Sequence, residues 1–151
     1  MHMPWDGSMR RDSRLSRMLH VLIHMDGHEG SATSERIAQM LGTNPVVVRR
    51  TLAGLREAGL VSSEKGPGGG WTLARELASI SLLDVYRALG EPPLFAVGPA
   101  LDDPACLVEQ AVNVALEDAF DEAEALLRGR LGKVTLADIA RDFERRRRAR
   151  S

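Results

Sequence analysis

Residues 33–71 constrain the fold of this chain most, because they predict a helix, a tight turn, a second helix and a glycine-tipped hairpin in immediate succession. Thr33 is a suitable N-cap for a helix that starts at the next residue, and Gly42 ends that helix. Asn44 and Pro45 start the second helix, since Asn caps free amides and Pro suits the first helical position. This order of elements predicts a winged helix-turn-helix and therefore a DNA-binding protein.

Each helix of the pair is expected to bury one face. In the second helix, predicted over 45–58, apolar residues recur at intervals of four and three and form a seam that needs a core. The seam consists of Val48, Leu52 and Leu55, and the residues that fall largely off it are Val46, Arg49, Arg50 and Arg56. The apolar face of the first helix is predicted at Ile37, Met40 and Leu41. Such a division is usual for a recognition helix that faces DNA.

The wing is predicted as two short strands, 60–63 and 71–73, around a turn at 66–70. Lys65 lies at the base of this hairpin, where its charge points toward any neighbouring phosphate. The glycine run matches neither nucleotide-binding motif. No Gly-Lys-Ser/Thr follows it, and the third glycine of the dinucleotide fingerprint is missing.

Size and charge are those of one domain with an extension. The 151 residues carry a net charge of -1, which argues against a uniformly basic nucleic-acid binder. Basic residues nevertheless cluster within 10–17 and on the predicted recognition helix, whereas acidic residues concentrate at 117–124. This polarisation is expected when only one end of the chain meets DNA. With no apolar run of bilayer length and no secretion signal, we expect a cytoplasmic protein without membrane contact.

The N-terminal part is predicted as follows. Residues 1–8 carry no usable pattern and are interpreted as a flexible leader, an expression remnant, or the product of an upstream start with Met9 as the alternative. The DNA-binding domain covers 9–90 and opens with a helix over 14–25, capped by Asp12 or Ser13. The buried stripe of that helix is predicted at Leu15, Met18, Leu19, Leu22 and Ile23, and Ser81 caps a later short helix with apolar Leu82, Val85, Tyr86 and Leu89.

A long C-terminal helix is expected to make a homodimer. After a connecting loop over 91–104, the helix is predicted from residue 105 to about 131. Its stripe consists of Val108, Val112, Ala115, Ala119, Ala123 and Leu127, with Leu116 and Phe120 beside it. A domain this small cannot cover such a stripe, so we expect a second copy to do so; an intramolecular helical hairpin is the alternative.

The end of the chain completes the predicted fold. Thr135 caps a short helix over 136–143, so that 105–143 forms the dimerisation segment. Residues 144–151 are expected to be a solvated basic tail, with DNA contact as the alternative. The fold class is therefore mainly α: a winged helix-turn-helix with a small two-stranded β wing and a long C-terminal dimerisation helix.

The chain resembles the Rrf-two family of bacterial transcription regulators over nearly all of 9–143. The resemblance rests on NPVVVRR at 44–50, GPGGG at 66–70, SISLLDVY at 79–86 and TLADI at 135–139. It implies a winged helix, a dimerisation helix that crosses to the partner subunit, and repression of genes for iron-sulfur assembly, cysteine metabolism, nitric-oxide response or redox stress. Two copies would read a near-palindromic site in double-stranded DNA.

Cysteine usage departs from the best-known members of this family, which carry an iron-sulfur cluster on three cysteines before the long helix. Here only Cys106 matches, and Asp102 and Asp103 cannot supply the soft ligands that a cluster needs. We therefore expect no cofactor and a place in the cluster-free branch, to which the run at 94–97 also points. Cys106, which has no intramolecular disulfide partner, is either a small buried hydrophobe or a redox sensor.

The resemblance and residue chemistry together predict the DNA contacts. Arg49 holds the family position that reaches base edges, where arginine favours guanine. Val47 is expected at a thymine methyl group or a sugar, and Arg50 at a phosphate. Lys65 occupies the family's minor-groove position on the wing. The other predicted contacts are Asn44 and Val46 near the recognition helix, and Arg14, Ser34 and Arg36 as phosphate clamps.

Other functions are weighed against DNA binding. His20, His24 and His28 are spaced four apart, but Gly27 is expected to end the helix, so we predict a solvated flank and no metal site. No nucleophile lies at motif spacing from a base, so no enzyme is predicted. Two alternatives stay open: a small-molecule effector in a pocket between 94–95 and the long helix, and a protein-interaction adaptor that does not bind DNA.

Overall fold

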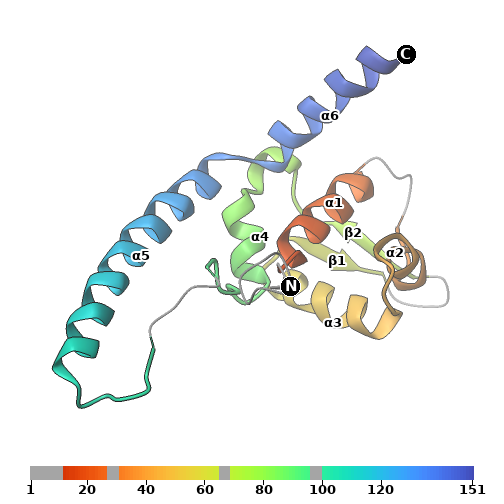
Figure 1. Ribbon diagram of the computed structural model, residues 1–151. Helices are drawn as coiled ribbons and strands as arrows, with labels where there is room; N and C mark the ends of the chain where they lie inside the picture. Colours follow the sequence, from red (N-terminus) through yellow and green to blue (C-terminus); the bar gives the residue numbers. More distant parts are fainter. Residues whose placement is uncertain (1–11, 27–30, 65–68, 96–99) are drawn as a thin grey trace, which may run out of the picture.

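The computed structural model describes residues 12–26, 31–64, 69–95 and 100–151 (Figure 1). Its elements are α1 (Arg14–Asp26), α2 (Ser34–Leu41), α3 (Pro45–Glu57), β1 (Val61–Ser63), β2 (Trp71–Leu73), the 3-10 helix η1 (Leu77–Ser79), α4 (Leu82–Ala88), α5 (Leu107–Lys133) and α6 (Leu136–Arg150). The predicted fold class, mainly α with a two-stranded wing, is confirmed. The predictions for the leader, for Lys65 and the wing tip, and for His28 lie outside the described residues.

Capping residues set the ends of the helix-turn-helix as the sequence predicts. The Thr33 hydroxyl accepts a hydrogen bond from the Arg36 N–H at 3.1 Å, and the Asn44 side chain accepts one from the Val47 N–H at 3.0 Å. Gly42 ends α2 with φ +67°, a left-handed conformation that only glycine adopts without strain. These caps fix where the turn between α2 and α3 begins and ends.

The wing is anchored to the segment that leads into α2. β1 and β2 pair antiparallel, with Ser63 opposite Trp71. The backbone of Ala32 adds to this pair, because its N–H donates to the Trp71 carbonyl at 3.0 Å and its carbonyl accepts from the Trp71 N–H at 2.8 Å. A Cβ at Gly70 would lie 2.5 Å from the Ala32 carbonyl oxygen. Glycine is therefore required at residue 70 for this close approach.

The core forms where α1, α2, α3, α4 and the base of the wing meet. The fully buried side chains include Val21, Leu22, Ile37, Val48, Leu52, Leu55, Leu60, Ile80, Val85 and Leu136. Leu136 reaches this core from α6, because the Thr135 N-cap pairs with Ser81 and brings the start of α6 beside the start of α4. The core thus joins the winged helix to the C-terminal helix.

Two predicted buried faces were partly wrong. In α1, Met18 and Leu22 are buried as predicted, but Val21 and Met25 are buried as well, whereas Leu15, Leu19 and Ile23 are only half-buried. In α2, Met40 is 41% exposed and Ala38 is buried instead. On both helices the apolar face is wider than the part that packs on the core. Periodicity alone does not say which edge of such a face is buried.

α5 leaves the compact domain and projects into solvent at its N-terminal end (Figure 1). None of its residues is fully buried. Its C-terminal part lies against α4, where the Arg128 guanidinium stands 5.3 Å from the Tyr86 ring centre and pairs with Glu91. Nearer the N-terminus of α5, the Phe120 ring stacks on that of Phe95, with 5.8 Å between the ring centres. Within the described residues, no helix is long and apolar enough to cross a bilayer.

The C-terminal helix is longer than predicted. α6 continues to Arg150, so the predicted end of this helix at residue 143 is wrong, whereas residues 145–151 are exposed as expected for a solvated basic segment. Carboxylates one turn earlier pair with the arginines: Asp142 lies 3.0 Å from Arg145 and 2.7 Å from Arg146. Such i,i+3 and i,i+4 pairs stabilise an exposed helix. α6 also points away from α5, so the alternative of a helical hairpin is wrong (Figure 1).

Candidate nucleic-acid interface

The recognition helix α3 separates its two faces as predicted. Val48, Leu52 and Leu55 are at most 2% exposed, and they hold the helix on the core. The opposite face presents Val46, 55% exposed, Val47, 43% exposed, and the exposed Arg49 and Arg50. Two guanidinium groups flanked by small apolar side chains suit a surface of phosphates, guanine edges and thymine methyl groups.

Arg49 has a carboxylate partner on the neighbouring helix. Its Nη1 lies 3.7 Å from Glu35 Oε1 in the first turn of α2, and both side chains are more than half exposed. An ion pair in water at this distance contributes at most about 1 kcal/mol. Arg49 is therefore held loosely near α2 and can be transferred to a guanine or a phosphate at small cost.

Asn44 and Arg36 lie at the N-termini of α3 and α2. The Asn44 side-chain oxygen caps α3, so only its NH2 group remains free for a base or a sugar. Arg36 is exposed in the first turn of α2. Helix N-termini bind anions through their free N–H groups and their dipole, which agrees with the predicted phosphate contacts here.

The side chain of Ser34 has a different role from the predicted phosphate clamp. It is 7% exposed, and its hydroxyl accepts a hydrogen bond from the Trp71 indole N–H at 3.0 Å. The hydroxyl therefore ties α2 to the wing rather than facing solvent. Sequence analysis missed this pair because the two residues are 37 positions apart and neither carries a local signal for the other.

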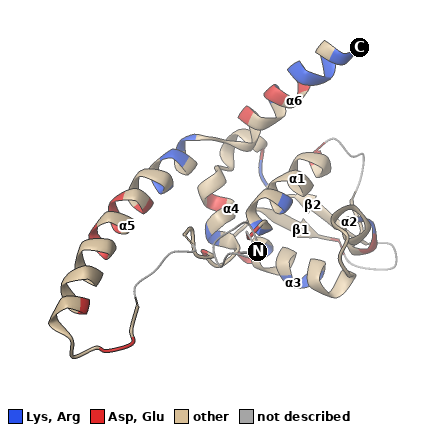
Figure 2. Cartoon of the chain, in the orientation of Figure 1, with Lys and Arg blue, Asp and Glu red and all other residues tan. Residues whose placement is uncertain are grey.

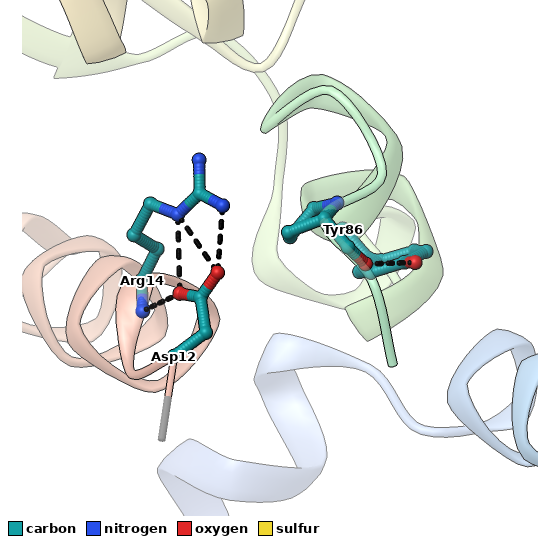
Figure 3. A network of polar contacts seen from close by, with 4 residues as sticks. Asp12, Arg14 and Tyr86 are labelled. Carbon is teal, nitrogen blue, oxygen red and sulfur yellow. Dashed lines mark hydrogen bonds and ion pairs between the residues drawn. The ribbon is translucent and has the colours of Figure 1, made fainter. Parts of the chain in front are cut away.

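Arg14 is paired with Asp12 at the start of α1 (Figure 3). Two side-chain nitrogens and the backbone N–H of Arg14 donate to the Asp12 carboxylate. These hydrogen bonds lower the pKa of Asp12 to about 2, and they raise the pKa of Arg14. Asp12 thus accepts the N–H of the first residue of α1, and a phosphate would have to compete with it for Arg14.

Figure 3 also shows Tyr86, a buried residue of α4. Its hydroxyl donates to the Pro92 carbonyl, and burial raises the pKa of the phenol. With Arg128 of α5 over its ring, Tyr86 connects the helix before the loop to the helix after it. This contact positions α5 against the DNA-binding domain.

The remaining predicted positions lie away from the recognition helix. Cys106 is the half-buried N-cap residue of α5. His20 and His24 are exposed on α1 with their rings stacked at 4.7 Å, and α1 runs to Asp26, one residue beyond its predicted end. In the part of the chain that the structure describes, no three His, Cys, Asp or Glu side chains gather as metal ligands would.

An apolar groove of about 720 Å³ lies between α1 and α6. It is lined by Leu15, Ser16, Leu19, His20, Ile23, His24, Ile139 and Phe143. The half-buried edge of the α1 stripe thus faces this groove. Beside Phe95, where a small-molecule pocket was predicted, the rings of Phe95 and Phe120 stack, and residues 96–99 of the same loop lie outside the described residues.

A capped pair of helices, an exposed recognition helix and a short two-stranded wing define a winged helix-turn-helix DNA-binding regulator. The sequence profile of the Rrf2 family, described as an iron-dependent transcriptional regulator, matches residues 11–142. The chain belongs to the Rrf2 family, which is the Rrf-two family that it resembles at the sequence level.

Individual relatives agree with this assignment. YwnA of Bacillus subtilis (strain 168), named as an HTH-type transcriptional regulator, is 36% identical over 129 residues, which cover 85% of this chain and 95% of YwnA. Protein rrf2 of Nitratidesulfovibrio vulgaris is 31% identical over 86% of this chain and 85% of its own length. A solved structure of a transcriptional regulator from Lactobacillus plantarum superposes with a TM-score of 0.72 at 27% identity, covering 87% of this chain and 90% of that one.

Proposed function

We propose that this chain is a homodimeric repressor that binds a near-palindromic operator, acts in the cytoplasm where such DNA lies, and carries no iron-sulfur cluster. The observation that carries the proposal is the exposed face of α3, where Arg49 and Arg50 stand beside Val46 and Val47 over a buried seam. Arginine pairs with guanine through two donors, which gives base preference, while its neighbours supply backbone contacts. Repression is the activity that the family resemblance implies.

The first half of α5 supports the dimer. Leu107, Val108, Val112 and Val114 are between 50% and 77% exposed there. Apolar area left in water costs roughly 25 cal/mol per Å², so a cluster of such side chains along one helix favours a covering surface. Because α5 belongs to a chain that is expected to bind a two-fold symmetric site, a second copy is the simplest cover.

We infer that α5 of the partner subunit binds in the groove between α1 and α6. Residues 107–124 of α5 contain six acidic side chains and no basic one, whereas α6 contains six arginines against three acids. Figure 2 shows this separation, with acidic segments along α5 and basic segments toward the end of α6. At 1.5 Å per residue, the 27 residues of α5 span about 40 Å, which is enough to reach across a two-fold axis.

The donor atoms of this chain fit an iron-sulfur cluster poorly. The family description names iron, and clusters are held by several thiolates, but this sequence contains a single cysteine. Asp102 and Asp103 are exposed in the loop before α5 and offer only hard oxygen ligands. Gating by Cys106 oxidation or by a small molecule is the alternative mode of control.

The test begins with selection of duplexes from a random library by the purified, thiol-reduced protein. Binding to the selected and to a scrambled duplex is then measured by fluorescence anisotropy over a salt series. Arg49→Ala is expected to lose at least about tenfold in affinity and to relax the sequence preference, since a good bidentate contact discriminates by about 1–3 kcal/mol. Arg87→Ala, which removes an exposed arginine of α4, is the matched control.

The outcomes separate the candidate functions. Selective, salt-sensitive binding that is lost in Arg49→Ala supports the repressor, and adding an oxidant then tests whether Cys106 controls it. Equal and weak binding of both duplexes indicates that an effector is needed. No binding at low salt contradicts the proposal and favours a protein-interaction adaptor.

A further inference from the structure

Trp71 lies at the junction of the elements that face DNA. It is 7% exposed at the start of β2, and its indole N–H donates to the Ser34 hydroxyl at the start of α2. Its backbone pairs with Ala32 on one side and with Ser63 of β1 on the other. The position of this one ring therefore determines how the wing stands against α2.

Arg56 completes the junction from the recognition helix. Its Nη1 donates to the Ser63 hydroxyl at 2.9 Å, and its guanidinium carbon stands 5.6 Å from the Trp71 ring centre. Ser63 and Trp71 are opposite each other in the wing, so one guanidinium contacts both strands at the same rung. Arg56 sits in the last turn of α3, whereas Arg49 and Arg50 lie in its first two turns.

We propose that Arg56 is a positioning residue that fixes the wing against the recognition helix, and that it does not itself contact DNA. The proposal rests on the proposed DNA binding. A guanidinium that lies over an aromatic ring and donates a hydrogen bond at the same time has fewer orientations available than a free one. The Ser63 hydroxyl takes one of the five N–H donors of Arg56, and a phosphate that turned the guanidinium to use the others would weaken its contact with Trp71. The wing and α3 contact DNA together, so a looser angle between them weakens binding without changing the bases that α3 reads.

The contact is tested first in the free protein. In a Trp5→Phe background, Trp71 is the sole tryptophan, since the sequence contains two. Arg56→Ala is expected to shift and intensify Trp71 emission, because it removes the cation and uncovers one ring face. Arg56→Lys, which keeps a cation near the ring, should shift the emission less. Thermal unfolding followed by circular dichroism checks that every variant is folded.

The consequence is tested on DNA with a double-mutant cycle. Arg56→Ala is expected to weaken binding to the selected duplex about tenfold, the sum of one hydrogen bond and one cation–π contact. Ser63→Ala alone should weaken it about threefold. The double variant is expected to be no weaker than Arg56→Ala, because both residues act through one contact. The selected base preference should remain that of the wild type. Arg50→Ala combined with Ser63→Ala is the control and should be additive.

The results that overturn the proposal are distinct from failure of the proposed function. If the affinity losses of Arg56→Ala and Ser63→Ala multiply in the double variant, the two residues act independently and Arg56 binds DNA directly. If Arg56→Ala binds the duplex with wild-type affinity, Arg56 has no role in DNA binding. If the wild type selects no duplex, the repressor function fails. The positioning contact is then decided by emission alone, and unchanged emission in Arg56→Ala rejects it.

Discussion

The winged-helix domain and α5 place similar apolar side chains in opposite surroundings. In the domain, Leu22, Ile37 and Leu52 are completely buried. In α5, Leu107 and Val108 are more than 70% exposed. Both regions are regular helices with apolar stripes, so the helical pattern does not distinguish them. The difference is that the domain contains the surface that covers its stripes, whereas the apolar side chains at the start of α5 extend beyond the surface that the described residues of this chain supply.

The largest effect is expected from a cavity in the domain core. Leu52→Ala removes a fully buried side chain between α3 and its neighbours and should lower the free energy of unfolding by about 2–5 kcal/mol. Urea unfolding followed by circular dichroism measures it. Leu101→Ala, at a residue 74% exposed, is the matched control and should change stability by less than about 0.5 kcal/mol. Equal losses in the two variants would mean that burial does not distinguish these sites.

A charge on α5 should break association while leaving the domain folded. Val112→Asp is expected to raise the dimer dissociation constant about hundredfold, because an unpaired carboxylate buried at an apolar interface costs several kcal/mol. Sedimentation equilibrium measures the constant, and circular dichroism follows the fold. Ala78→Asp places the same charge on an exposed residue of η1 and should leave association unchanged. A Val112→Asp variant that associates like the wild type would contradict the role of α5.

Two glycines provide the smallest test of the same contrast. Gly70→Ala should destabilise the domain by about 1–3 kcal/mol, since its Cβ would meet the Ala32 carbonyl. Gly129→Ala in α5 meets nothing within 4 Å and should stabilise its helix by up to about 1 kcal/mol. Melting temperatures of both variants give the two signs. If Gly129→Ala were destabilising, the added methyl group would be meeting a surface that this single chain does not supply, such as that of a second copy.

Local chemistry made much of the fold and of the interface predictable. Thr33, Asn44 and Ser81 cap their helices through side chains that act within three residues, so their roles are visible in the sequence. The seam of α3 and the exposure of Arg49 follow from helical periodicity in the same way. By contrast, Met40 was placed in the core wrongly, because its helix is buried along one edge of a wide stripe. The last turns of α6 were not predicted, because the arginine run was interpreted as a tail without regard to the carboxylates of Asp142 and Glu144, which pair with it along the helix.

The sequence by itself determined the order of helices and strands, their caps, and which face of α3 points outward, because each depends on interactions within one or two turns of chain. Only the tertiary structure decided that Ser34 holds Trp71, that Arg56 reaches across to the wing, and that a groove opens between α1 and α6. Those contacts join residues that are distant in sequence, and their free energy is realised only after the core has brought the elements together. No local pattern specifies them.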